Sequence, residues 1–132
     1  MLKGIGHIGI AVRDIEKTLT AIAALLQVPV PPIKDVPEKK ARVALLQLGP
    51  IGLEFVQDDS EDGALGRFVR ERGDGLHHVC ILSDQIEADV QALVARGVEM
   101  ASVRPAVGLR GKKVAFAKPS AANGIVFEFS EP

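Results

Sequence analysis

Apolar and polar residues along the chain follow the periods of strands and helices. Residues 7–12 alternate between the two classes, which places His7 on the face of a strand opposite Ile8. Asp14 is a suitable N-cap for a helix that follows directly. The apolar residues of this helix share one side, namely Ile15, Leu19, Ile22, Ala23 and Leu26. These residues predict a strand followed by an amphipathic helix.

The rest of the first half predicts three more strands. The proline-rich residues 28–37 end the helix and permit only a short edge strand. Residues 41–48 and 51–57 are apolar and are separated by Gly49 and Pro50, which is typical of a hairpin. The first half therefore has the predicted order β, α, β, β, β.

The second half repeats this pattern after a linker that holds one short helix. A strand begins at His78, and the apolar positions of the next helix lie 71 residues after those of the first, at Ile86, Val90, Leu93 and Val94. This helix is expected to stop at Gly97. Further strands are expected at residues 98–103, 112–117 and 125–129. The order is again β, α, β, β, β.

The length and the repeat predict one α+β domain. At 132 residues the chain has the length of a single domain. We expect that domain to cover residues 1–132, with repeat one at about residues 4–58, a linker at 59–73 and repeat two at about 74–132.

Composition narrows the function classes. The formal net charge of −1 and the pI near 6.3 speak against binding to nucleic acid or to an anionic membrane surface. No apolar run reaches the roughly 20 residues that span a bilayer. Cys80 has no cysteine partner within the chain, and the N-terminal residues do not resemble a signal peptide. We therefore expect a cytoplasmic protein that is not embedded in a membrane.

Two histidines and two glutamates occupy equivalent positions of the repeats. His7 and His78 begin the first strands, and Glu54 and Glu128 each lie between two large apolar residues of the last strands. Alternation turns both glutamates away from the helices. Imidazole and carboxylate groups bind divalent metals, and four protein ligands would leave two positions for a bidentate substrate. We predict a shared metal site; alternatively, the histidines cap backbone groups and the glutamates are solvated.

Three neighbouring features have less specific patterns. By alternation His77 points away from His78 and is expected to pack or to support a ligand. Cys80 lies in an apolar strand and is read as a buried structural thiol. Arg110 and Lys112 belong to a glycine-punctuated basic loop that could hold a phosphate or a carboxylate, or could be a solvated hairpin.

The segments HIGIAVRDIEK, GDGLHHVCI and GLRGKKVAFAKPSAANGIVFEF resemble the vicinal oxygen chelate superfamily. Within it they most resemble the methylmalonyl-CoA epimerases, over essentially the whole chain. The resemblance implies a curved, barrel-like mixed sheet with helices on the outside. It implies that His7, His78 and Glu128 bind a divalent metal ion (cobalt, nickel, manganese or zinc), with Glu54 at the fourth position. A separate third-strand glutamate of some members is replaced here by Val43.

The resemblance also implies an activity. It predicts a metal-dependent epimerase that interconverts (R)- and (S)-methylmalonyl-CoA by α-proton abstraction through a metal-stabilised enolate. Glu128 is the preferred base, with Glu54 or a metal-bound water opposite, and Arg110 and Lys112 would meet the acyl-CoA substrate's phosphates or free carboxylate. A homodimer is expected. Two alternatives stay open: a glyoxalase I-type lactoylglutathione lyase, and a non-catalytic small-molecule binding or resistance protein of the same fold.

Overall fold

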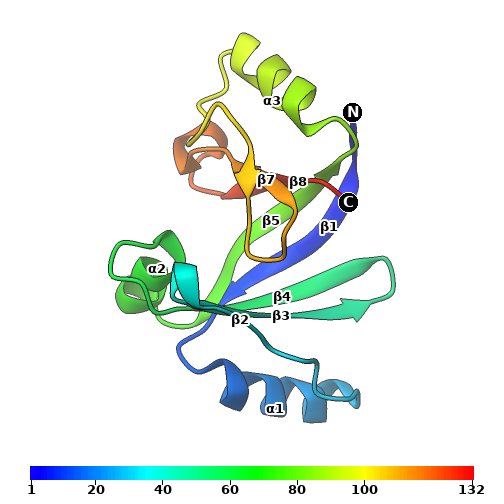
Figure 1. Ribbon diagram of the computed structural model, residues 1–132, viewed down its shortest axis with the longest axis vertical. Helices are drawn as coiled ribbons and strands as arrows, with labels where there is room; N and C mark the ends of the chain where they lie inside the picture. The colour runs from blue at the N-terminus through cyan, green and yellow to red at the C-terminus, as the bar shows by residue number, and fades with distance from the viewer. The chain divides into compact units, whose positions relative to one another are not determined.

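The computed structural model describes residues 1–132 and confirms the α+β class with two βαβββ repeats (Figure 1). Repeat one contains β1 (Leu2–Ala11), α1 (Ile15–Leu26), β2 (Lys34–Val36), β3 (Ala41–Leu48) and β4 (Ile51–Asp58). Repeat two contains β5 (Gly75–Ser83), α3 (Ile86–Ala95), β6 (Ala106–Val107), β7 (Lys113–Phe116) and β8 (Phe127–Ser130). The linker holds α2 (Ala64–Arg72), and short 3₁₀ turns cover Pro37–Lys39 and Pro119–Ala122.

The chain forms two compact units whose boundaries cut through β1 and β5. One unit is Gly9–His77, and the other combines Met1–Ile8 with His78–Pro132. Strand β1 begins in the unit that contains Met1–Ile8 and ends in the unit Gly9–His77, whereas β5 begins in the unit Gly9–His77 and ends in the other unit. Each repeat therefore contributes to both units.

In the unit Gly9–His77, β3 lies between β2 and β4, and both pairs are antiparallel. The end of β1 continues this sheet beside β4, where the Val12 N–H donates to the Val56 carbonyl at 2.9 Å. Helix α1 runs alongside β3 and β4 (Figure 1). Its buried side chains pack with Phe55 in a cluster that consists of Val12, Ile15, Leu19, Ala44, Leu46 and Phe55.

Helix α1 begins and ends as its sequence predicts. The Asp14 carboxylate accepts a hydrogen bond from the Lys17 N–H at 3.1 Å, which satisfies one of the free amide groups of the first turn. Ile15 and Leu19 are fully buried on the face toward the sheet. The helix ends at Gln27, which adopts a left-handed conformation with φ 57°.

In the other unit the strand order is β1-β5-β8-β7-β6. Strands β5 and β8 are parallel, whereas β7 is antiparallel to both of its neighbours, so the sheet is mixed. Helix α3 contributes Ile86 and Val90 to a second core with Phe129. This core is the counterpart of the α1 core, because Ile86 and Val90 occupy the same repeat positions as Ile15 and Leu19.

The prediction of a strand at residues 98–103 is wrong. The amides of Gly97 and Val98 donate to the carbonyls of Val94 and Leu93, both at 3.0 Å, and so close the end of α3. Met100 makes one isolated bridge to Ala117. The strand of this part of the repeat is instead β6, six residues beyond Met100. No strand forms at residues 98–103, because Val98, the first residue of the predicted strand, takes part in the end of α3.

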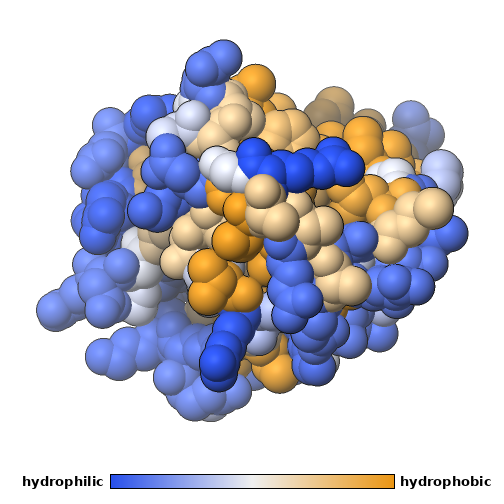
Figure 2. Space-filling model, turned by 90° about the horizontal axis from the view of Figure 1, so that it is seen from above, coloured by the Kyte–Doolittle hydropathy of each residue, from blue (hydrophilic) through white to orange (hydrophobic).

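The surface mixes hydrophilic and hydrophobic residues, as the face in Figure 2 shows. Exposed large apolar side chains in the unit that contains α3 include Val94, Val103, Val107 and Ile125. Some exposed apolar residues are usual on a protein surface. No helix has both the length and the apolar character needed to cross a membrane.

Candidate metal centre

Neighbouring strands β1 and β5 bring the imidazoles of His7 and His78 together. Burial alternates along both strands and places each histidine among the buried residues, with exposures of 2% and 5%. The two Nε2 atoms are 3.3 Å apart. Gly6, the residue before His7, leaves room for the Leu82 side chain of the neighbouring strand, because a Cβ atom there would lie 2.6 Å from it. The paired histidines predicted from the repeat therefore share one buried site.

Glu128 reaches the same point from β8. It lies opposite Cys80 in the parallel pairing of β5 with β8 and is 6% exposed. Its Oε1 atom lies 3.0 Å from His7 Nε2 and 3.6 Å from His78 Nε2. This oxygen is buried without a hydrogen bond of its own. A buried carboxylate oxygen in this state is costly unless a positive charge compensates it.

The electrostatic surroundings favour an ionised Glu128. Burial raises the pKa of the carboxyl, but the adjacent His7 and His78 imidazoles and the Cys80 thiol outweigh burial and hold the pKa below its usual value of 4.5. The carboxylate is therefore charged at neutral pH. A charged carboxylate can bind a metal ion or accept a proton.

The three donor atoms fit a divalent cation. Ligand atoms about 2.1 Å from one ion are separated by about 3.0 Å at right angles and by about 3.4 Å at the tetrahedral angle. The separations of 3.3, 3.0 and 3.6 Å among His7, His78 and Glu128 lie close to these values. The unsatisfied oxygen of Glu128 and the donor types agree with this assignment. These residues could hold a divalent ion that prefers nitrogen and oxygen ligands.

Cys80 belongs to the same cluster of donors, although the sequence pattern predicted only a buried thiol. Its sulfur lies within 4.8 Å of ligand atoms from His7 and Glu128. The expectation of a buried thiol is confirmed, since Cys80 has no exposed surface. The available signal was its position two residues after His78, on the same strand face.

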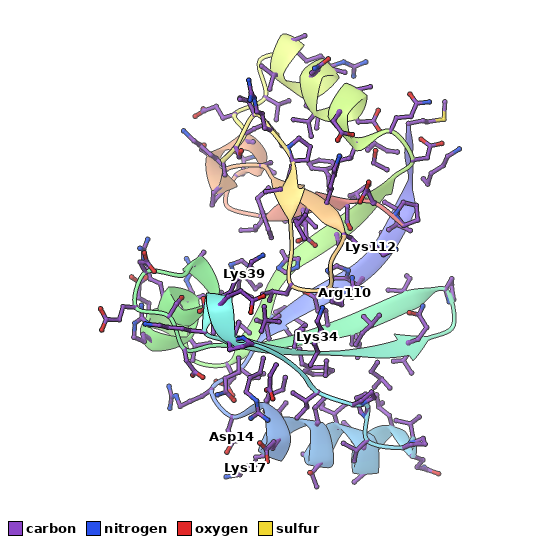
Figure 3. All side chains as sticks on the ribbon, viewed as in Figure 1. Asp14, Lys17, Lys34, Lys39, Arg110 and Lys112 are labelled. Carbon is purple, nitrogen blue, oxygen red and sulfur yellow. The ribbon has the colours of Figure 1, made fainter.

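The other predicted site residues have different surroundings. Glu54 lies on β4 in the unit Gly9–His77, where it is 7% exposed, and its part in the ligand set stays a prediction. His77 packs edge-on against Phe68 of α2, with ring centroids 5.2 Å apart. Arg110 and Lys112 come from the hairpin between β6 and β7 (Figure 3). Lys112 is exposed, whereas Arg110 is half-buried and its Nη2 lies 3.2 Å from His7 Nδ1.

The fold and the donor set define a class of α+β proteins in which two βαβββ repeats carry histidine and glutamate at equivalent strand positions. The family model of the Glyoxalase/Bleomycin resistance protein/Dioxygenase superfamily matches residues 6–116, and the chain belongs to this superfamily. The resemblance found in the sequence is thereby confirmed at the level of the family.

Similar proteins span nearly the whole chain. The uncharacterized protein YqjC of Bacillus subtilis (strain 168) is 33% identical over 126 residues, which cover 96% of this chain and 90% of YqjC. The human mitochondrial methylmalonyl-CoA epimerase is 28% identical over 128 residues, which cover 96% of this chain and 73% of that protein. A variant of the Streptomyces coelicolor methylmalonyl-CoA epimerase, solved with 2-nitronate-propionyl-CoA, has a TM-score of 0.91 and 26% identity, with 99% and 95% of the two chains covered.

Proposed function

We propose that the chain is an acyl-CoA epimerase that interconverts (R)- and (S)-methylmalonyl-CoA. The observation that carries this proposal is the buried Glu128 carboxylate beside the His7 and His78 imidazoles, in a chain whose relatives include proteins named methylmalonyl-CoA epimerase. The donor set supports a metal-dependent reaction of a substrate that presents two oxygens. A malonyl thioester offers such a pair, one from the carboxylate and one from the thioester.

The proposed metal ligands are His7, His78 and Glu128, with Glu54 as the fourth. Cobalt, nickel, manganese and zinc all suit such a set. A divalent ion held there would supply Lewis-acid stabilisation of negative charge on the substrate oxygens. Glu54 is included because it matches Glu128 in the other repeat and is buried on β4.

The chain's own groups would move the proton. In the proposed reaction, Glu128 takes the α-proton of methylmalonyl-CoA, and a proton returned from the opposite face gives the other enantiomer. Glu54 is the proposed donor on that face. Val43 supports this choice, because the position that carries an additional glutamate in some epimerases holds a buried aliphatic residue here. Arg110 and Lys112 are proposed to meet the substrate's carboxylate or phosphates.

Solvent deuterium exchange tests the proposal. Methylmalonyl-CoA incubated in D₂O with Co²⁺-supplied protein should gain one deuterium at the α-carbon, as read by mass spectrometry. Glu128→Gln keeps the size of the side chain but cannot accept the proton, so exchange should fall by about 100-fold or more. Glu87→Gln on the exposed surface of α3 is the matched control and should exchange like the wild type. If the wild-type protein leaves the α-position unlabelled, it is not an epimerase of this substrate.

A further inference from the structure

Cys80 places its sulfur beside two of the proposed metal ligands. It follows His78 by two residues on β5, so both side chains lie on the same face of the strand. The pairing of β5 with β8 puts Cys80 opposite Glu128, and the thiol hydrogen-bonds to the Glu128 carboxylate. The sulfur also lies within 4.8 Å of a His7 ring nitrogen. Strand geometry therefore brings a sulfur, an imidazole nitrogen and a carboxylate oxygen to one point.

A second observation at this point indicates a cation. The Oε1 atom of Glu128 is buried without a hydrogen bond, on a side chain that is 6% exposed. Its neighbours include the Nε2 atoms of His7 and His78, at 3.0 and 3.6 Å, which are proposed ligand atoms themselves. A buried carboxylate oxygen in this state is costly unless a positive charge compensates it. The sulfur of Cys80 is fully buried next to this carboxylate, so an ion that Glu128 binds is within its reach.

The sulfur completes a four-ligand set within one compact unit. The two histidines, the glutamate and the cysteine all belong to the unit that combines Met1–Ile8 with His78–Pro132. Imidazole, carboxylate and thiolate are the ligands of tetrahedral zinc sites. A nitrogen or oxygen about 2.1 Å from an ion and a sulfur about 2.3 Å from it are about 3.6 Å apart at the tetrahedral angle. The sulfur lies on a single rotatable bond, so it can approach an ion without a change in the strand backbone.

We propose that Cys80 is a further metal ligand that determines which ion the site selects. Zinc and cobalt recruit its sulfur beside His7, His78 and Glu128, whereas manganese leaves the sulfur unbound. Thiolate sulfur favours zinc and the later transition metals, and carboxylate and water oxygens suit manganese. When zinc or cobalt binds, a metal–sulfur bond replaces the S–H bond and the proton passes to solvent. The inference rests on the metal site of the proposed function and deepens it by naming the class of ion.

Cobalt reports this ligand directly, because a bond between Co²⁺ and a thiolate produces a charge-transfer band in the near ultraviolet. Metal-free wild-type protein titrated with Co²⁺ should develop the band together with the visible bands of bound cobalt. Cys80 is the only cysteine of the chain, so the band can have no other source. Cys80→Ser is close in size but has no sulfur, and it should keep the visible bands and lose the charge-transfer band. A wild-type protein that binds Co²⁺ without this band would overturn the proposal.

Metal selectivity provides the second measurement. Cys80→Ser and Cys80→Ala should each weaken Zn²⁺ binding by about 10- to 100-fold, because even residues that only support a ligand contribute this much. Both variants should keep the Mn²⁺ affinity of the wild type within about twofold. Val79→Ala, the neighbouring substitution on the other face of β5, is the matched control and should leave both affinities unchanged. Circular dichroism checks that all variants are folded.

Two results would contradict the role in selectivity. Equal losses of Zn²⁺ and Mn²⁺ affinity in the Cys80 variants would mean that the cysteine only supports the fold of the site, and unchanged Zn²⁺ affinity would mean that it takes no part. The test also separates this inference from the proposed function. A protein with the cobalt band and the zinc preference but no deuterium exchange retains the Cys80 inference and loses only the epimerase activity. Exchange without the band has the opposite meaning.

Discussion

His77 and His78 show how strand alternation separates two identical side chains. They are neighbours on β5, yet His78 lies with His7 and Glu128 whereas His77 packs against Phe68. Only His78 can serve as a ligand of the candidate metal centre. The pair therefore offers a variant and its control within one dipeptide.

We expect His78→Ala to weaken Zn²⁺ binding by about 100-fold or more, because even residues that only support a ligand contribute about 10- to 100-fold. His77→Ala should retain the wild-type affinity. A competition titration against a chromophoric chelator measures both, and circular dichroism checks that both variants are folded. Comparable losses in the two variants would contradict the assignment of His78.

The direction of a side chain could be predicted from the sequence where its residue lies on a regular strand. Strand alternation and the repeat fix the direction of His7, His78 and Glu128, so their common burial could be predicted, while their role as metal ligands stays a prediction. The contact of Arg110 with His7 and the place of Cys80 beside His7 and Glu128 were not predicted. The direction of Arg110 depends on a hairpin turn, which has no period in the sequence. Alternation places Cys80 on the strand face of His78, but its place beside Glu128 follows only from the pairing of β5 with β8.

At the scale of elements, an ion pair joins α3 to β7. Lys113 donates to the Glu87 carboxylate; this bond lowers the pKa of Glu87 from its usual 4.5 and raises the pKa of Lys113 from 10.5. An acid whose pKa is lowered on folding stabilises the fold at pH values above its usual pKa. That stability is lost as the pH falls through the lowered pKa. The raised pKa of Lys113 acts in the opposite sense, so its contribution is lost as the pH rises through the raised value. The pair therefore stabilises the fold between these limits.

Glu87→Gln should accordingly lower the melting temperature slightly at pH 7, and the difference from the wild type should shrink as the pH falls below 4.5 and vanish below the lowered pKa, where Glu87 is protonated in both the folded and the unfolded state. Both side chains are about half exposed, so 1 M salt should also reduce the difference. Thermal melts followed by circular dichroism give the values. Lys113→Met is the control, and the double variant should be no less stable than either single one. A difference that persists in acid would mean that the ion pair does not stabilise the fold.

Most elements were predictable because their local signals agree with their packing. Helix α1 has both a capping residue and a buried stripe, and β3 and β4 are apolar runs on either side of a turn. The segment at residues 98–103 failed for a physical reason. Its apolar residues finish α3 and bridge to Ala117, and neither contact requires an extended ladder. Apolar composition alone cannot distinguish a strand from the end of a helix or an isolated β-bridge.

At the scale of the whole molecule, the repeat explains why there are two cores of the same design. Ile15 and Ile86 open equivalent helices, and each is buried with a phenylalanine of the last strand of its repeat, Phe55 or Phe129. The two core clusters share no residue. The homodimer expected from the sequence stays a prediction, as do the domain boundaries.

Independent cores predict additive effects on stability. Ile15→Val and Ile86→Val each remove one buried methylene, so each should lower the free energy of unfolding by about 0.5–1.5 kcal/mol. Residues without shared partners add within about 0.5 kcal/mol, and the double variant should therefore lose the sum of the two. Urea unfolding measures all four proteins, and Ile125→Val at an exposed position is the control that should cost little. A loss in the double variant well below or above the sum would show that the two cores are coupled. The equivalent isoleucines would then belong to one cooperative core rather than to two that the repeat builds separately.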